Sequence, residues 1–267
     1  MKKIVAIVNQ KGGVGKTTTS INLAAAFALM KRRVLLVDLD PQGNATVGSG
    51  VNHDAFTLTV KDVLLQTATI PQAIIKTEGK YDVLPTNADL IIAEVQLMQT
   101  TAREGRLKQA LALVADQYDH ILIDCPPSLN ILTVNALTAA DGVLIPVQCE
   151  YFALEGLKSL LETIKQIQQQ VNPTLEIDGL LRTMYDGRNR LAVDVSTQLM
   201  QHFPGKVYHT VIPRNIRLAE APSHGLAVIQ YDEKSQGSVA YLALAGEILR
   251  RREEQKLEQH NTEEIAL

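Results

Sequence analysis

Residues 4–20 read IVAIVNQKGGVGKTTTS, and the architecture of the chain follows from them. The apolar run from Ile4 to Val8 predicts a strand, which leads through a glycine-rich loop into the start of a helix. Glycine lets several backbone N–H groups approach one anion, and a helix N-terminus favours negative charge. Lys16 adds a positive charge for the terminal phosphates, and Thr17 adds a hydroxyl for Mg²⁺. The sequence therefore predicts a nucleoside triphosphate site.

The loop departs from the ordinary phosphate-loop pattern G-x-x-x-x-G-K-[ST] at its start. Gln10 stands where that pattern has its first glycine, and Lys11 opens the loop instead. A cation at this position faces any bound phosphate, in its own subunit or in a facing one, whereas the alternative is an ordinary solvated lysine. The residues predicted to bind the nucleotide here are Lys11, Gly12, Gly13, Val14, Gly15, Lys16, Thr17 and Thr18.

Composition fits a single large α/β domain. The chain has 267 residues, 46% of them hydrophobic but only 4% aromatic, which suits parallel strands buried on both faces. A net charge of −3 implies no global attraction to nucleic acid, so any such attraction must be local. Cys125 and Cys149 end apolar runs without metal-type spacing, and we expect buried, reduced thiols in a cytosolic protein. No apolar run is long enough for a transmembrane helix.

Short β-branched runs alternate with longer helical patterns, which predicts βαβ units and a doubly wound, mostly parallel sheet with helices on both faces. The expected strands are 3–9, 33–38, 81–85, 119–124, 142–148, 178–184 and 207–212. The expected helices are 16–31, 89–98, 103–117, 129–139, 153–170, 190–202 and 236–253. We also expect a mobile loop over 43–54. The domain should span 1–253, and the polar, acidic residues 254–267 should form a frayed tail.

Carboxylates follow two more of the apolar runs, and the carboxyl ends of parallel strands share one rim of a sheet with the phosphate loop. Asp38 and Asp40 follow the run VLLV, and Asp124 follows ILI. A strand that ends in Asp is typical of the strand that holds Mg²⁺ in phosphate-loop enzymes, which assigns the metal to Thr17 and Asp124. Asp38 or Asp40 should position the attacking water, and we favour Asp40, farther out on the loop. The alternatives are a helix N-cap for Asp124 and a turn before Pro41 for the other pair.

Five segments together carry a family resemblance. They are KGGVGKTTT (11–19), VDLDPQGN (37–44), IDCPPS (123–128), PVQCEYFALEG (146–156) and VIPRNIRLAEAPSHG (211–225). From residue 1 to about 250 the chain resembles the ParA/Soj family of DNA-segregation ATPases. The first segment alone marks only the broader deviant Walker A group, which includes MinD and nitrogenase iron protein, whereas the last two segments are much more specific.

The resemblance implies a Mg²⁺-dependent ATPase in which ATP joins two subunits face to face. Lys11 matches the signature lysine that reaches across to the partner's phosphates, and Lys16 and Thr17 match the phosphate-loop lysine and threonine. Asp40 matches the water-positioning aspartate, and Asp124 matches the Walker B aspartate. The implied catalytic residues are thus Lys11, Lys16 and Asp40.

The resemblance also implies an adenine site, partners and a location. Adenine should lie near Pro213 and Asn215. The expected partners are non-specific double-stranded DNA, a ParB-type centromere-binding protein and a second copy of the chain, in the cytoplasm on the nucleoid. Because the phosphate loop starts at residue 11, without the DNA-reading domain that precedes it in large plasmid ParA proteins, the chain looks like the chromosomal Soj type. No membrane anchor is expected, since the end of the chain lacks the bulky apolar residues of MinD-type helices. The rival functions are a MinD-like membrane switch and a metabolic ATP-dependent ligase on the same fold.

A basic segment suggests where DNA would bind. Residues 182–217 hold six lysines and arginines against two aspartates, although the whole chain is acidic. Clustered positive charge suits contacts to phosphates, which give affinity without reading the base sequence. The alternative is a solvated surface with local ion pairs, such as Arg217 with Glu220. Together with the family resemblance, this segment predicts DNA contacts at Arg188, Arg190, Arg214 and Arg217.

Overall fold

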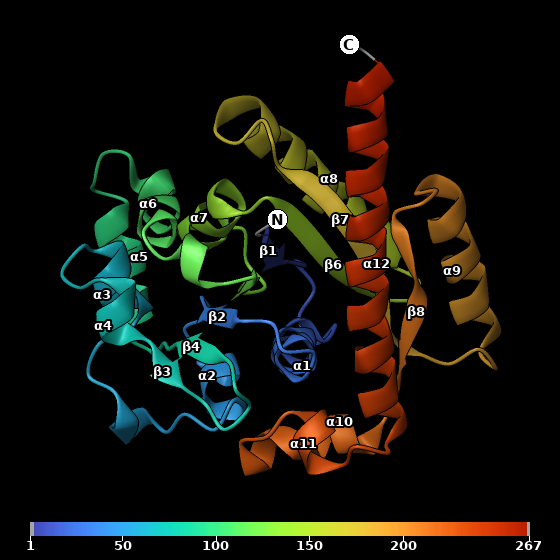
Figure 1. Cartoon of the computed structure of the whole chain (residues 1–267), viewed down its shortest axis with the longest axis horizontal. Coiled ribbons are helices and arrows are strands. Elements are labelled where there is room, and N and C mark those ends of the chain that lie inside the picture. Colours follow the sequence, from blue (N-terminus) through green and yellow to red (C-terminus); the bar gives the residue numbers. More distant parts are fainter. Residues whose placement is uncertain (1–2, 266–267) are drawn as a thin grey trace.

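The computed structural model describes residues 3–265 of the chain. Its centre is an eight-stranded sheet (Figure 1). The strand order is β3-β4-β2-β5-β1-β6-β7-β8, and every neighbouring pair is parallel except β3 and β4. The strands are β1 Lys3–Ile7, β2 Val34–Asp38, β3 Ile75–Lys76, β4 Asp82–Leu84, β5 His120–Asp124, β6 Gly142–Gln148, β7 Glu176–Tyr185 and β8 Val207–Pro213. The doubly wound, mostly parallel fold is confirmed.

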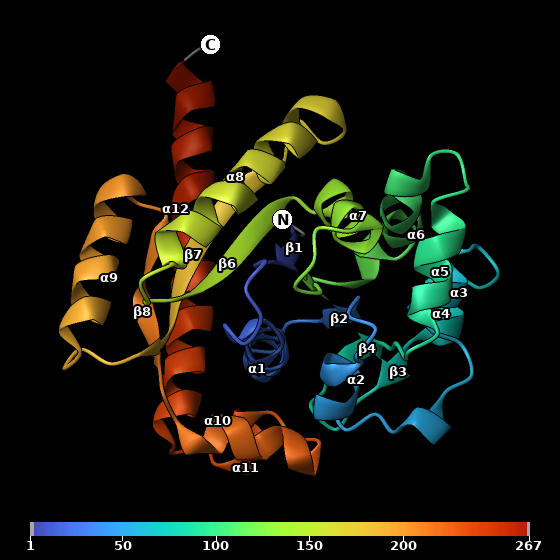
Figure 2. The same ribbon diagram turned by 180° about the vertical axis from the view of Figure 1, so that it is seen from behind.

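Helices cover both faces of the sheet, because alternate residues of each strand point to opposite sides. On β1, Ala6 packs with the apolar cluster that includes Leu132 of α7 and Leu160 of α8. Ile7 packs on the other side, with Phe27 of α1 and other residues of a second cluster. The long helix α12 lies in front of the sheet in Figure 1, and α8 lies in front in Figure 2.

The longer helices agree with the prediction except over 103–117 and beyond residue 253, and the short helices were not predicted. The longer helices are α1 Lys16–Leu29, α5 Leu90–Leu97, α6 Arg106–Ala112, α7 Ile131–Ala139, α8 Ala153–Gln170, α9 Arg190–His202 and α12 Gln236–Ile265. The short ones are α2 Asn44–Gly48, α3 Val60–Leu64, α4 Ile70–Ala73, α10 Ile216–Glu220 and α11 Val228–Tyr231. No helix in this described part of the chain has the length and apolarity needed to cross a bilayer.

Three expectations about local structure are wrong. The helix expected over 103–117 is interrupted, because the Asn135 side chain accepts the N–H of Leu107 and donates to the carbonyl oxygen of Arg103, the two groups that a continuous helix would join. The segment expected to be a mobile loop contains α2, whose residues Ala45 and Thr46 are buried. The residues from 254 to 265 continue α12 as a helix instead of fraying at once.

Candidate functional site

The glycine-rich loop joins the end of β1 to the start of α1, at the carboxyl rim of the sheet. Gly13 (φ 73°) and Gly15 (φ 86°) have positive φ values, which other residues rarely adopt. A Cβ atom added to Gly12 or Gly13 would meet no atom within 4 Å, so the space over the loop is open. Beneath it, the Thr183 hydroxyl of β7 donates to the carbonyl oxygen of Val14 at 2.8 Å. The loop is thus held from below and free above, as an anion-binding loop must be.

Lys16 lies in the floor of this site and is only 7% exposed. Its ammonium donates to the carbonyl oxygen of Lys11 at 3.3 Å, across the loop. Burial lowers the pKa of Lys16, while the nearby carboxylates of Asp124 and Asp40 oppose that shift. A cation held in a partly dry site interacts strongly with a phosphate group, because little water competes for it.

Thr17 and Asp124 meet as the prediction of a metal site requires. The Thr17 hydroxyl donates to one carboxylate oxygen of Asp124 at 2.8 Å, and the Ser20 hydroxyl donates to the other at 2.7 Å. Asp124 is fully buried, and burial raises its pKa to about 6. The N-cap alternative for Asp124 is wrong, because Asn130 caps α7. A threonine hydroxyl beside a buried carboxylate is an oxygen donor set that suits Mg²⁺.

Asp38 and Asp40 have different surroundings although only Leu39 separates them. Asp38 is fully buried and faces Asp124 across the β2–β5 pairing. It accepts hydrogen bonds from the Thr46 N–H and hydroxyl, at 2.8 and 2.7 Å, and from the Asp40 N–H at 3.1 Å. Burial, followed by the charge of Asp124, raises the pKa of Asp38 to about 8. Asp40 is half-buried and accepts the N–H of Gln42, which leaves carboxylate capacity for a water molecule.

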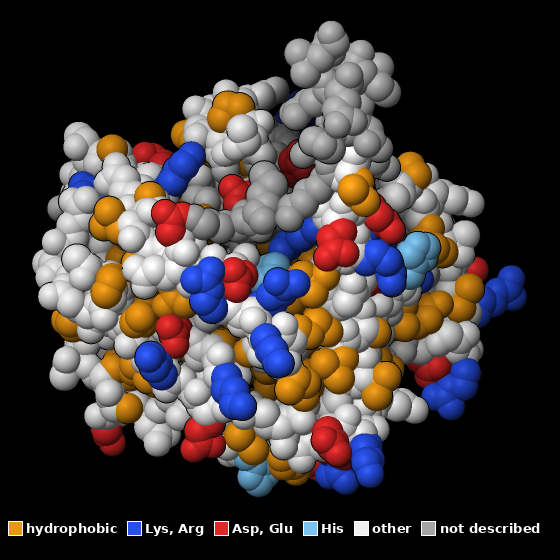
Figure 3. Space-filling model, in the orientation of Figure 1, with side chains coloured by type: hydrophobic (Ala, Val, Ile, Leu, Met, Phe, Trp, Pro, Cys, Tyr) orange, Lys and Arg blue, Asp and Glu red, His pale blue; other side chains and the backbone are white. Residues whose placement is uncertain are grey.

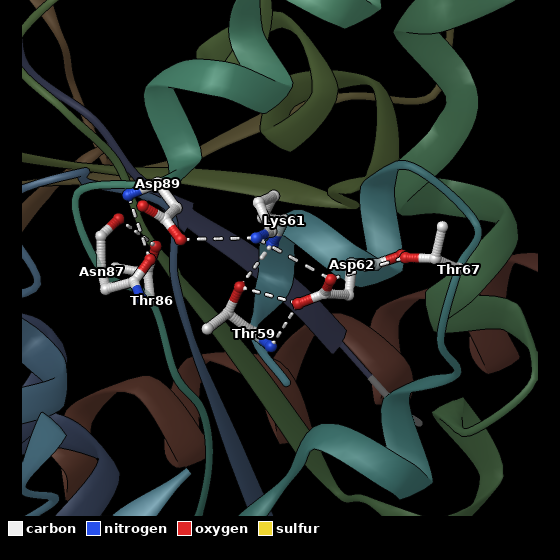
Figure 4. A network of polar contacts seen from close by, with 7 residues as sticks. All are labelled: Thr59, Lys61, Asp62, Thr67, Thr86, Asn87 and Asp89. Atoms are coloured by element: carbon white, nitrogen blue, oxygen red, sulfur yellow. Dashed lines mark hydrogen bonds and ion pairs between the residues drawn. The ribbon is translucent and has the colours of Figure 1, made fainter. Parts of the chain in front are cut away.

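The hydrogen bonds around Asp38 continue away from the site through Thr46. The Thr46 hydroxyl accepts the N–H of Thr86 at 3.1 Å, and Thr86 belongs to the polar network shown in Figure 4. In that network the Asp89 N–H donates to the Asn87 side chain, and Lys61 of α3 lies 3.4 Å from Asp89. Through Thr46, the Asp38 carboxylate is therefore connected by hydrogen bonds to the segment between β4 and α5.

Lys11 is partly exposed at the mouth of the loop, where its ammonium pairs with Glu150 at 2.5 Å. The Asn9 side chain positions the start of the loop, since it accepts the Lys11 N–H and donates to the carbonyl oxygen of Pro146 on β6. Exposed Tyr151 and Phe152 follow Glu150 and pack edge to face. Lys11 thus lies at the surface and forms an ion pair with Glu150, which precedes these two exposed aromatic side chains.

The expected adenine residues lie at the end of β8. Pro213 is its last residue, and the Asn215 side chain accepts the N–H of Arg217 as the N-cap of α10. Thr18, by contrast, lies in the first turn of α1, and its carbonyl oxygen accepts from Asn22. The structure therefore gives Asn215 a capping role, and its contact with adenine stays a prediction.

The basic segment divides into buried and exposed arginines. Arg182, which contributed to the charge count, is 7% exposed and donates to Ser196 and to the backbone of Tyr208 and His209. Because it supports β8 and α9 from inside, it does not form part of the exposed basic surface. Arg188 and Arg217 are exposed, as are the other predicted contacts.

Three of the four predicted DNA contacts carry acidic partners from their own subunit. Arg188 is 92% exposed and binds both oxygens of Asp186, whose pKa falls to about 2 because of that hydrogen bonding. Arg190 lies 4.0 Å from Asp194. Arg217 pairs with Glu220 and Asp232. Arg214 forms no ion pair with any of the described side chains.

Sequence reasoning missed four residues that build the site: Ser20, Thr46, Glu150 and Thr183. Three of them had a usable signal. Glu150 follows β6 and Thr183 lies near the end of β7, on the rim where ligands bind. Ser20 lies four residues after Lys16 and therefore on the same side of α1. Thr46 had no such signal, since its position depends on the unpredicted helix α2.

Known proteins resemble the chain in sequence over almost its whole length. A family model described as an AAA domain matches residues 2–177. The sporulation initiation inhibitor protein Soj of Bacillus subtilis is 53% identical, with 93% of this chain and 98% of that protein covered. The chromosome partitioning protein ParA of Caulobacter vibrioides is 52% identical, with 93% and 94% covered.

Solved structures agree with the same fold. A cobyrinic acid a,c-diamide synthase from Mycobacterium smegmatis, with bound ATP analogue and magnesium, has a TM-score of 0.84 and 39% identity, covering 95% of this chain and 96% of that one. The cell division ATPase MinD of Pyrococcus furiosus has a TM-score of 0.78 and 28% identity, covering 94% and 99%. The two relatives named Soj and ParA are about half identical to the chain and span nearly its full length. The chain therefore belongs to the ParA/Soj family of chromosome-partitioning ATPases.

Proposed function

We propose that this protein hydrolyses ATP with Mg²⁺ and uses the nucleotide to control its dimerisation and its binding to DNA. The observation that carries the proposal is the arrangement at the rim. Buried Lys16 and the Thr17–Asp124 pair lie under an open glycine loop, and a second lysine, Lys11, lies at the loop's mouth. Lys16, Thr17 and Asp124 suffice to bind the nucleotide with Mg²⁺. Lys11 is not needed for that binding and can instead contact a phosphate of a second subunit that faces the loop.

Each residue has a distinct part in this proposal. The loop's N–H groups and Lys16 bind the phosphates of ATP, and Thr17 and Asp124 hold Mg²⁺. Mg²⁺ supplies neutralising charge at the phosphate oxygens. Asp40 accepts a hydrogen bond from water and orients it for attack, because it is the accessible member of the Asp38–Asp40 pair.

Dimerisation would connect this chemistry to DNA. Lys11 leaves Glu150 and binds the partner's phosphates, so ATP favours the dimer over the monomer. Each subunit then contributes one small arginine surface, and two surfaces on one body bind the same duplex with higher avidity than either alone. Hydrolysis, stimulated by a ParB-type partner, returns the subunits to the monomer. The monomers then dissociate from the nucleoid DNA into the cytoplasm.

One observation supports a second candidate. The Mycobacterium smegmatis structure, 39% identical, carries the name of a cobyrinic acid a,c-diamide synthase. That identity is lower than the 52–53% shared with the partitioning proteins. A synthase of this kind would consume ATP in proportion to an added carboxylic acid substrate and would not respond to DNA.

Band-shift measurements with a random duplex test the proposal. The duplex is titrated with protein without nucleotide, with ADP and with ATP, each with and without competing anionic liposomes. We expect a shift only with ATP, and we expect liposomes not to compete. Liposome binding without DNA binding would instead favour a MinD-like switch, and ATP turnover that depends on a small acid would favour the synthase.

A further inference from the structure

Arg217 lies between two carboxylates of its own subunit. Its Nη1 atom donates to Glu220, one turn later on α10, at 2.7 Å. Its Nε atom lies 3.3 Å from the carboxylate of Asp232, which follows α11. Acidic and basic side chains also lie next to each other along the lower edge of Figure 3, where α10 and α11 are found. The arginine is 45% exposed, so a large ligand can still reach it.

The neighbouring segment holds Asp232 in place. The Asp232 N–H donates to the carbonyl oxygen of Val228, and its own carbonyl oxygen accepts from the Ser235 N–H and the Ser238 hydroxyl. Arg217 is fixed as well, because Asn215 caps its N–H at 3.0 Å. The ion pair therefore joins two positioned backbones and does not depend on two freely moving side chains.

Geometry makes these carboxylates compete with a phosphate group. A guanidinium can hold a phosphate with two parallel N–H bonds along either of two edges, Nη1 with Nη2 or Nε with Nη2. Glu220 occupies one atom of the first edge, and Asp232 lies beside one atom of the second. A phosphate that binds along the Nε–Nη2 edge must therefore displace Asp232, whose contact at 3.3 Å is longer than that of Glu220 at 2.7 Å.

A ligand also has room to enter beside this edge. Arg217, Asp232, Glu233 and Lys234 line one open cavity of about 540 Å³ between α10 and α11. A phosphate on a DNA backbone is small compared with that space. Entry is therefore limited by the exchange of ion partners and not by size.

We propose that Asp232 is an affinity-setting residue that lies against Nε of Arg217 in the free subunit and must move away when a DNA phosphate binds along the Nε–Nη2 edge. This inference rests on the proposed function, since it concerns the same DNA surface. Its consequence is that a single subunit binds DNA weakly, because part of each phosphate contact replaces an existing ion pair. Control by ATP becomes stricter, since only a dimer with two such surfaces binds firmly.

The test compares Asp232→Asn with a matched control, Glu233→Gln. Both changes remove one negative charge from the same cavity, but none of the described side chains forms an ion pair with Glu233. Duplex affinity with ATP is measured for both variants at the same salt concentration, in the parent and in an Arg217→Ala background. Thermal melting checks that each variant is folded.

We expect Asp232→Asn to raise DNA affinity more than Glu233→Gln does, by up to about fivefold per subunit, the range of exposed ion pairs. In the Arg217→Ala background the difference between the two variants should disappear, because the shared partner is gone. Equal effects in the parent, or a difference that persists without Arg217, would overturn the inference and leave the proposed function intact. If the unmodified protein fails to bind DNA with ATP, the proposed function itself fails.

Discussion

The nucleotide rim and the arginine surface use charge in opposite ways. At the rim, Lys16 and Asp124 are buried and supported by the register of adjacent strands and by the start of α1. On the surface, Arg188 and Arg217 are exposed, project from a loop and a short helix, and carry acidic partners within their own subunit. A buried charge cannot be removed without leaving another unpaired, whereas an exposed ion pair is worth about 0–1 kcal/mol. Substitutions at the rim should therefore abolish the protein's activity. Substitutions of the surface arginines should only change the strength of DNA binding.

Replacing Lys16 should have the largest effect. Lys16→Ala removes a cation from a partly dry site, where each charge-assisted bond contributes about 1.5–3 kcal/mol. We expect ATP affinity to fall by at least one to two orders of magnitude in equilibrium titration. Lys158→Ala, which changes an exposed lysine on α8, serves as the control. Unchanged ATP binding in Lys16→Ala would mean that the nucleotide lies elsewhere.

Asp40 and Lys11 should separate hydrolysis from dimerisation. Asp40→Ala should retain ATP but slow its hydrolysis by about 10²-fold or more, the usual contribution of a positioned base, and so accumulate the dimer. Lys11→Ala should bind ATP and remain monomeric. Sedimentation with ATP distinguishes the two variants. A monomeric Asp40→Ala protein or a dimeric Lys11→Ala protein would contradict the assigned roles.

Buried Asp38 should give the protein a pH-dependent stability. Its pKa is about 8 when folded, well above the ordinary value of 3.8, so the folded state holds a proton that the unfolded state releases. The stabilising contribution of Asp38 is complete below pH 3.8 and is lost as pH rises through about 8. Asp38→Asn, which cannot ionise, should therefore gain stability relative to the parent between pH 5 and pH 8, by on the order of 1 kcal/mol or more. Urea unfolding without nucleotide or Mg²⁺ measures the difference, and an identical pH profile for both proteins would rule out the protonated carboxyl.

The arginine substitutions should have the smallest effects and should act on DNA alone. Arg188→Ala, Arg190→Ala, Arg214→Ala and Arg217→Ala should each weaken ATP-dependent DNA binding without preventing dimerisation. Arg214→Ala should weaken it most, because this arginine breaks no ion pair of the described structure when it meets a phosphate. The log–log salt slope should shrink by roughly two units per variant, one phosphate per subunit. Salt titrations of duplex binding provide the slopes, and parental slopes in all four variants would place the DNA surface elsewhere.

Local sequence was a good guide where one segment makes a whole feature. The phosphate loop was predictable residue by residue, because a strand, a glycine turn and a helix start lie within seventeen residues (4–20). It was a poor guide where distant segments meet. Arg182 was counted with the basic surface, yet the contacts of β7 with α9 and β8 bury it. The mobile loop expected over 43–54 contains α2, since Thr46 binds Asp38 and orders the turn.

By itself the sequence determined the α/β fold, the phosphate loop with Lys16 and Thr17, and the two aspartate-bearing strand ends, because hydrophobic period and glycine placement act over a few residues. Tertiary structure alone decided which aspartate is buried, since Asp38 lies opposite Asp124 only after β2 and β5 pair. It likewise decided that Arg217 meets Asp232, fifteen positions along the chain, across the junction of α10 and α11. The physical reason is that the ionisation and pairing of a charged side chain depend on the dielectric and the partners around it, and distant segments supply both.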